Sequence, residues 1–232
     1  MTGDPAGALA AAERLEATAS CSGAEAGHDP RTGPLIHLYK GRALAALNRH
    51  EQARHHLRLY FDLFPATPRP AERSIDAAVD LARACTALGD TPCALAQYRV
   101  ITGLADSLAS WSGREANAAI ERKDLPAAAG NLRAALKWNP QDDRLRRLLA
   151  QTLNELGGHE EAIATWRDLD RRLDGDEEAL HNIAGLSLAM HRPADAIAAF
   201  ERLREIEDDP DVITEIDDAI TQVRKNSSAV RP

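Results

Sequence analysis

Apolar residues recur at spacings of three and four along most of the chain, in stretches of about 13 residues separated by short polar turns. Such spacing places the apolar side chains on one face of a helix, so the pattern predicts an all-α protein built from paired amphipathic helices. We expect these helices at residues 34–48, 50–64, 71–88, 91–104, 109–122, 125–137, 143–156, 159–171, 177–190 and 193–206. Two further helices are expected at 5–19 and 210–225, where Pro5 and Pro210 suit a first turn.

The helical pattern repeats with a period of about 34 residues. Each copy has a small residue in its first helix, another in its second helix twelve positions later, and a large apolar residue four positions beyond that. The small residues are Ala82, Ala116, Ala150 and Ala184 in the first helices, and Ala94, Ala128, Ala162 and Ala196 in the second. The large residues are Tyr98, Leu132, Trp166 and Phe200. An earlier copy, at a longer offset, has Gly41, Ala53 and Leu57 in these places.

Small residues that face each other let two helix axes approach closely, and a larger side chain at such a contact costs about 1–3 kcal/mol. The large residue of each copy is expected to pack against the next copy. One helix pair buries too little surface to fold alone, so the copies should stack into a solenoid.

This agreement of several phases at one period resembles the tetratricopeptide repeat (TPR) family. The resemblance implies a right-handed α-solenoid of about five helix-turn-helix repeats, near residues 34–67, 75–108, 109–142, 143–176 and 177–208 of an array at 34–208. Residues 1–33 would then form an N-terminal helix and loop, residues 209–226 a capping helix, and residues 227–232 a disordered tail. Pro65, Pro68 and Pro70, between the first two repeats, predict a bend or a hinge.

In TPR proteins the first helices line a concave groove that binds peptides or helices, so the resemblance implies a non-catalytic adaptor or scaffold for complex assembly. Carried over by phase, the groove would present ten side chains to a peptide or partner protein. They are Leu35, Leu38, Arg42, Val79, Arg83, Asn117, Arg144, Arg147, Gln151 and His181.

Four of these residues, Arg42, Arg83, Asn117 and Gln151, share one repeat phase and are expected to form a ladder of hydrogen-bond donors. Such a ladder suits the carbonyls or carboxylates of an extended segment. A polar surface without a ligand is the simpler alternative. Two other functions stay open: an exported assembly factor of a bacterial envelope machine, such as a pilus or secretion complex, and a subunit that positions or regulates a partner enzyme.

A His-Glu pair occurs twice in a context close to the zinc motif H-E-x-x-H, but Arg54 and Ile163 stand where the second histidine belongs. Both pairs begin a predicted second helix, where the helix dipole favours acids. His50, His55 and His56 lack a further ligand at a suitable spacing, so we expect a solvated basic face there and no metal site. The sequence holds no recognised catalytic motif, and we expect neither an enzyme nor a cofactor.

Cys85 and Cys93 flank the turn of the second copy. A disulfide requires Cα atoms within about 7 Å, which positions on either side of a helical turn can satisfy. The alternative is a pair of small buried thiols. A disulfide would indicate an oxidising compartment. Trp138 and Trp166 fall in apolar phases and are expected in the core, whereas the place of Trp111 is less determined.

The net charge of -8 argues against nucleic acid as a partner. No apolar run approaches the ~18 residues of a membrane span, and the N-terminus lacks a basic leader. We therefore expect a cytoplasmic protein, or a periplasmic one if a leader has been removed.

Charge is unevenly distributed along the chain. The stretch from His37 to Arg73 has seven Lys or Arg and three acids, whereas Glu205 to Asp218 has eight acids and no base. Opposite ends of this kind would orient a partner. Head-to-tail self-association and simple solvation are alternatives, and the sequence leaves the oligomeric state open.

Overall fold

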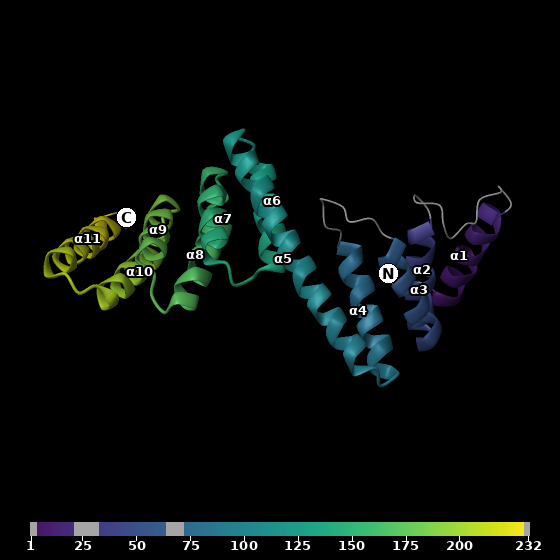
Figure 1. The fold of residues 1–232 in the computed structure, drawn as a ribbon. Coiled ribbons are helices and arrows are strands. Elements are labelled where there is room, and N and C mark those ends of the chain that lie inside the picture. The colour runs from purple at the N-terminus through teal and green to yellow at the C-terminus, as the bar shows by residue number, and fades with distance from the viewer. Residues whose placement is uncertain (1–3, 21–32, 64–71, 230–232) are drawn as a thin grey trace. The chain divides into compact units, whose positions relative to one another are not determined.

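The computed structural model describes residues 4–20, 33–63 and 72–229, and all regular structure within these ranges is helical (Figure 1). The helices are α1 (Pro5–Ser20), α2 (Gly33–Ala46), α3 (His50–Leu63), α4 (Glu72–Ala87), α5 (Thr91–Glu121), α6 (Leu125–Trp138), α7 (Asp143–Glu155), α8 (His159–Leu173), α9 (Glu177–Ala189), α10 (Pro193–Ile206) and α11 (Pro210–Ala229). The all-α prediction is confirmed. None of the described helices is both long and apolar enough to cross a membrane.

Two differences from the predicted helices stand out. Residues 91–104 and 109–122 do not form two helices but belong to the single 31-residue helix α5. Helix α11 continues to Ala229, so residues 227–229 are helical and not part of a disordered tail. The predicted hinge at Pro65, Pro68 and Pro70, most of the predicted loop at 21–33 and the last three residues lie outside the described ranges.

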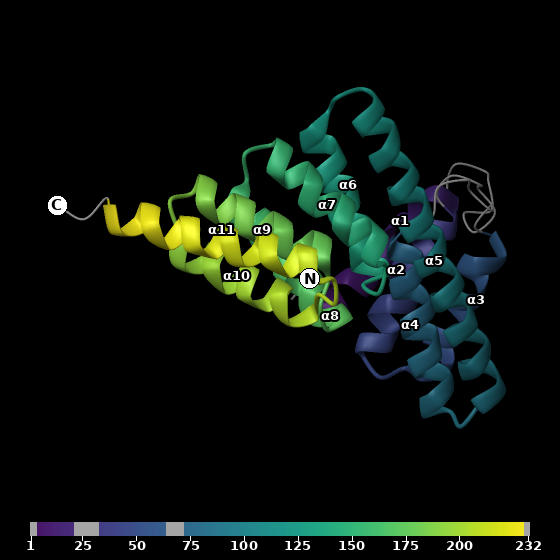
Figure 2. The same ribbon diagram turned by 90° about the vertical axis from the view of Figure 1, so that its left-hand side faces the viewer.

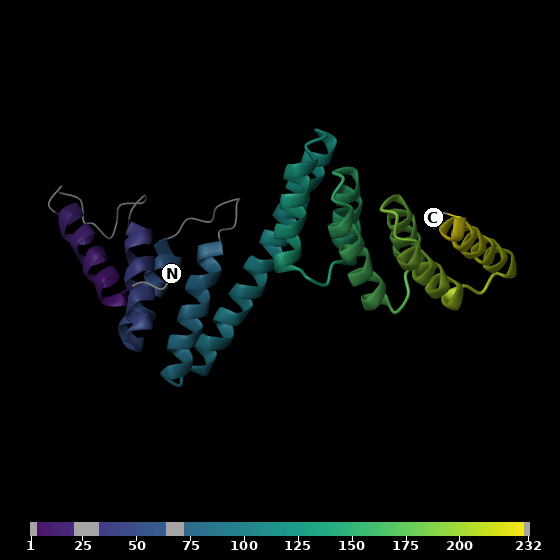
Figure 3. The same cartoon turned by 180° about the vertical axis from the view of Figure 1, so that it is seen from behind.

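The chain divides into two compact units, Met1–Trp111 and Ser112–Pro232, and α5 contributes to both. In the first unit α2 packs against α1, α3 and α4. Figure 3 shows α1, in purple, beside the blue α2. Leu38, Leu57 and Tyr60 are almost fully buried between these helices. Gly41 lets α3 approach closely, but the nearest side chain is Leu57 and not the predicted Ala53, because a Cβ atom at Gly41 would lie 2.6 Å from the Leu57 Cγ atom.

In the second unit each helix from α6 to α11 packs against the next one along the chain. Figure 2 shows α9, α10 and α11 side by side. The alanines of the repeat pattern are completely buried here, with exposures of 0% at Ala116, Ala128, Ala150, Ala162, Ala184 and Ala196. Trp166 is also 0% exposed, so its predicted place in the core is confirmed. The pattern of small and large residues thus sets the packing of this unit.

The turn inside each helix pair is the same in all five copies. One residue adopts a left-handed conformation at the equivalent position of each copy, namely Asn48, Gly89, Lys123, Gly157 and His191. The amide after it donates to a carbonyl five positions back, as Asp124 does to Ala119 over 2.9 Å. This is the Schellman arrangement that ends a helix. The second helix then begins at once, which explains why His50 and His159 are the first residues of α3 and α8.

Candidate functional site

The first helices of the first unit carry an arginine that the sequence assigns to the groove. The Arg42 guanidinium on α2 lies 3.3 Å from a carboxylate oxygen of Asp76 and 3.1 Å from one of Asp80, both on α4. Arg83 approaches Asp80 at 3.8 Å. Burial raises the pKa of Asp80, and the charge of Arg42 opposes this rise. Arg42 therefore links two first helices.

The second unit repeats this arrangement between α7 and α9. The Arg147 guanidinium lies 2.5 Å from Asp176 and 2.8 Å from Glu178. The Gln151 side chain donates to Glu178 over 2.9 Å. Sequence reasoning identified the donors but did not pair them with these acids, although Asp176 and Glu178 stand at the start of the following first helix. The donors thus bridge successive first helices.

The other groove candidates differ in exposure. Leu38 is 1% exposed and lies in the core beside Leu57 and Tyr60, so it offers no surface to a partner. It is buried because the face of α2 that carries it packs against the neighbouring helices. Leu35 and Val79 are half-buried, whereas Asn117 and Arg144 are exposed.

A polar hollow of about 270 Å³ lies between α7 and α9. It is lined by Asn154, His181, Asn182, Gly185 and Leu186. The Asn154 side-chain oxygen pairs with the His159 ring at 3.2 Å, and the Asn182 side-chain amide donates to the Glu178 backbone carbonyl over 2.7 Å. The amide and imidazole groups can both donate and accept hydrogen bonds, as the backbone of an extended peptide requires.

A second hollow, of about 670 Å³, lies between α10, α11 and the turn after α9. Its lining residues are Leu188, His191, Arg192, Pro193, Phe200, Ala219, Gln222, Val223, Asn226 and Ser227. Two of them, Leu188 and Ala219, lie one repeat after Asn154 and Gly185 of the polar hollow. The two hollows therefore occupy equivalent places in successive repeats, one with polar and the other with mainly apolar walls.

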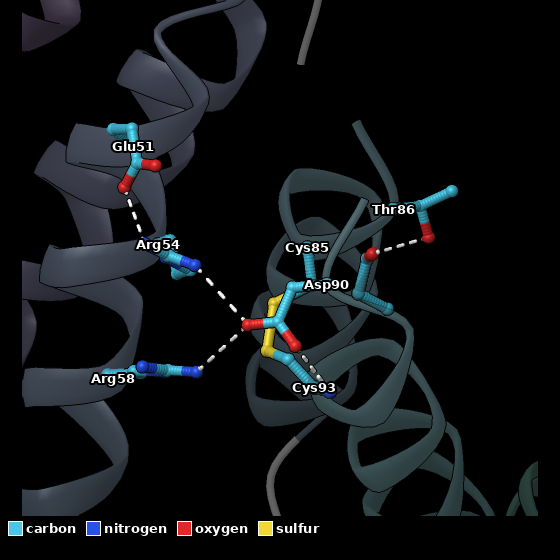
Figure 4. Close-up of a disulfide and its surroundings, with 8 residues drawn as sticks. Glu51, Arg54, Arg58, Cys85, Thr86, Asp90 and Cys93 are labelled. Carbon is cyan, nitrogen blue, oxygen red and sulfur yellow. Dashed lines mark hydrogen bonds and ion pairs between the residues drawn. A yellow bond between two sulfur atoms is a disulfide. The ribbon is translucent and has the colours of Figure 1, made fainter. Parts of the chain in front are cut away.

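The structure joins Cys85 and Cys93 in a disulfide across the α4–α5 turn, with Cα atoms 5.8 Å apart (Figure 4). One Asp90 oxygen caps α5 by accepting from the Cys93 amide at 3.1 Å. The other lies 3.3 Å from Arg54 and 3.8 Å from Arg58 on α3. The disulfide and Asp90 together connect three helices of the first unit.

Within the described ranges, one cluster of residues has the composition of a possible metal site. Only Cys85, Asp90 and Cys93 bring three ligand atoms of His, Cys, Asp or Glu close together, and the disulfide occupies both sulfurs. Arg54, which replaces the second histidine of the zinc-like motif, pairs with Glu51 at 2.6 Å. Its counterpart Ile163 is 3% exposed in the core.

The predicted basic face of α3 is partly packed. His56 stacks on His37 of α2, with their Nδ1 atoms 3.0 Å apart, and His55 lies edge-on to His56. Burial, together with nearby His37 and Lys40, lowers the pKa of His56 from 6.5 to about 4. The Lys40 ammonium pairs with Glu16 of α1. His56 therefore joins a packed cluster on three helices.

A family model described as tetratricopeptide repeat matches residues 119–183. Among solved structures, the chain is similar to the TPR domain of P58(IPK), at 13% identity over 94% of this chain and 66% of that chain, with a TM-score of 0.40. It is also similar to MamA AMB-1, at 18% identity over 77% and 95% with a TM-score of 0.41. A third similar structure is Pseudomonas aeruginosa pilF, at 16% identity over 84% and 86% with a TM-score of 0.41. No curated protein matches the chain.

Proposed function

Because residues 119–183 match the tetratricopeptide repeat family, whose fold generally serves protein interaction, we propose that this chain is a non-catalytic adaptor that binds an extended segment of a partner protein. The segment lies on the first helices α7 and α9, over the polar hollow at His181. The observation that carries this proposal is the hollow itself, because it brings unfilled space and hydrogen-bonding side chains together on the surface assigned to the groove.

The ion pairs between first helices sharpen this proposal. The Arg147 charge is already paired with Asp176 and Glu178, and the Gln151 amide already donates to Glu178. A partner therefore gains most from the polar groups around the hollow and from exposed Arg144. The paired residues keep α7 and α9 at the spacing that leaves the hollow open.

Gly185 offers a clean way to test the hollow. A Cβ atom at Gly185 meets nothing within 4 Å, so Gly185→Leu fills open space without a clash. Replacing a helical glycine also stabilises the helix, by up to about 1 kcal/mol. Gly130 of α6 is likewise exposed with nothing within 4 Å, and Gly130→Leu is a matched control that lies away from the hollow.

The experiment is affinity capture from the native cells with the wild-type protein, Gly185→Leu and Gly130→Leu. We expect one or more partners to bind the wild type and Gly130→Leu, and to be lost with Gly185→Leu. If all three proteins captured the same partners equally, the hollow would not be the binding site.

The disulfide favours one setting for this adaptor, namely an oxidising compartment. This supports the alternative of an exported assembly factor over a cytoplasmic location. Alkylation of the protein from native cells, without reductant, tests it by mass spectrometry. We expect Cys85 and Cys93 to stay unmodified until a reductant is added; prompt labelling of both thiols would favour the cytoplasm.

A further inference from the structure

The first half of α5 exposes an apolar face where the repeat pattern places a buried one. Leu95 is 56% exposed and Tyr98 is 55% exposed. Their equivalents in the later copies are buried or partly buried in the core of the second unit: Ala129, Ile163 and Ile197 for Leu95, and Leu132, Trp166 and Phe200 for Tyr98. The face therefore has the composition of a packing surface without the cover that such a surface has elsewhere.

The chain's own next segment is a poor cover for this face. In the later copies the next first helix brings Leu149 and Ile183 into the core, at 6% and 4% exposed. The equivalent residue in the second half of α5 is Glu115, whose burial against Tyr98 would be costly. Residues 109–121 also continue the same helix and do not turn back.

Charged residues on this face point to its occupant. Arg99, Thr102 and Asp106 lie on the same side of α5 as Leu95, because these residues follow one another at spacings of three or four positions. Tyr98 lies three positions after Leu95 and four before Thr102, so it borders the same side. Within the described ranges, the side chains of Arg99 and Asp106 have neither an ion pair nor a hydrogen bond, and both are exposed. A face with one free cation and one free anion, two turns apart, is complementary to itself when inverted.

We propose that this α5 face, defined by Leu95, Tyr98, Arg99, Thr102 and Asp106, is a two-fold contact between two copies of the chain. The two α5 helices pair antiparallel, so Arg99 of each copy meets Asp106 of the other. The two-fold axis then passes near Thr102 and Gly103. Gly103 has open space around it and lets the helices approach closely. Tyr98 and Leu95 pack on the partner helix beside the two ion pairs. Tyr98 is the kind of aromatic residue that often anchors an interface.

Charge reversal tests the pairing directly. Sedimentation of the full chain over the micromolar range is expected to show a monomer–dimer equilibrium. Arg99→Glu or Asp106→Arg alone places like charges together twice, and each is expected to weaken the dimer by at least about tenfold. The double variant Arg99→Glu/Asp106→Arg restores both pairs and is expected to dimerise within about threefold of the wild type.

Mixing the two single variants is the most specific arm. One chain then has two acids and the other two bases, so the mixture forms a heterodimer although each variant alone is mainly a monomer. Tyr98→Ala is expected to weaken the dimer, whereas Tyr39→Ala is not, since Tyr39 is an equally exposed tyrosine on α2 at 50%. A wild type that stays monomeric, or a double variant no better than the single ones, would overturn the proposal; the second result would indicate a different protein on this face.

Discussion

Tyr98 and Trp166 occupy the same place in two copies of one repeat, yet one is 55% exposed and the other is 0% exposed. The difference lies in the path of the chain beyond each residue. After Trp166 the chain leaves the helix at Asp174, whose left-handed conformation ends α8, and α9 returns to pack against α8. After Tyr98 the chain stays helical as far as Glu121.

The sequence explains why α5 does not stop. Copy three ends at Asn139 and Pro140, and a residue before proline is disfavoured in helical conformation. Copy four ends at Asp174 and Gly175. The equivalent of Pro140 and Asp174 in the second copy is Asp106, and the next residues are Ser107 and Leu108, neither of which breaks a helix. The packing residues of a repeat are therefore buried only when a helix-ending residue lets the chain turn back before the next copy.

The largest expected effect compares the two aromatic residues directly. Trp166→Ala should lower the free energy of unfolding by about 3–5 kcal/mol, because it leaves a large cavity in the core. Tyr98→Ala in dilute protein should change it by less than about 0.5 kcal/mol, because the ring is exposed. Urea denaturation monitored by circular dichroism measures both, and similar losses would mean that Tyr98 is covered in solution.

A proline in the middle of α5 tests whether the helix is continuous. Ser107→Pro should destabilise the protein by about 3 kcal/mol, because it removes a backbone hydrogen bond and clashes with the preceding turn. Ser107→Ala is the matched control and should stay within about 0.5 kcal/mol of the wild type. A proline that costs less than about 1 kcal/mol would show that the helix already breaks there.

The first unit should lose stability in acid through protonation of His56. The residues equivalent to His56 in the later second helices have side chains that do not titrate: Gln97, Asn131, Thr165 and Ala199. The pKa of His56 falls from 6.5 to about 4 on folding, so the folded state binds the proton more weakly. Its contribution to stability is complete above the unfolded pKa of 6.5 and is lost as the pH falls through about 4. Because His56 is only half-buried, we expect a loss on the order of 1–2 kcal/mol after allowing for solvent screening.

Replacement of His56 isolates this effect. Denaturation at neutral and acidic pH should show that His56→Gln loses less unfolding free energy in acid than the wild type does. His181→Gln, which replaces an exposed histidine of the second unit, is the matched control for the substitution itself. An unchanged dependence in His56→Gln would place the acid sensitivity elsewhere.

The smallest expected effect concerns the turns, where the five copies agree. Lys123→Gly should stabilise the protein by about 0.5–1 kcal/mol, because glycine adopts the left-handed conformation without a steric cost. Gly157→Ala is its inverse in the next copy and should destabilise by about 1 kcal/mol. Thermal unfolding measures both, and shifts of the same sign would contradict the equivalence of the two turns.

The periodic positions could be predicted from the sequence because they depend on local geometry and volume. The buried alanines, Trp166 and the starts of α3 and α8 all agree with the spacing alone. The fused helix was missed because the repeat period masked a local signal, namely the absence of a helix-breaking residue at Asp106.

The candidate site was less accessible to sequence reasoning. The repeat pattern assigned His181 to the groove surface, where the structure has the hollow. The hollow itself exists because residues with small side chains, such as Gly185, leave the space open. The repeat pattern also suggested free donors at Arg42 and Gln151, whose acceptors in the structure come from the following first helix. Pairing between helices is a property of three-dimensional packing, which a one-dimensional period does not contain.

The identical turns make the repeats interchangeable as building blocks. Joining Lys123 directly to Gly158 removes residues 124–157, one whole repeat of sequence, and presents the same left-handed residue to the same kind of second helix. The same junction accepts an added copy. The number of repeats in this protein can therefore change through a deletion or duplication of one repeat of sequence, because the turn at the new junction is the same as the existing turns.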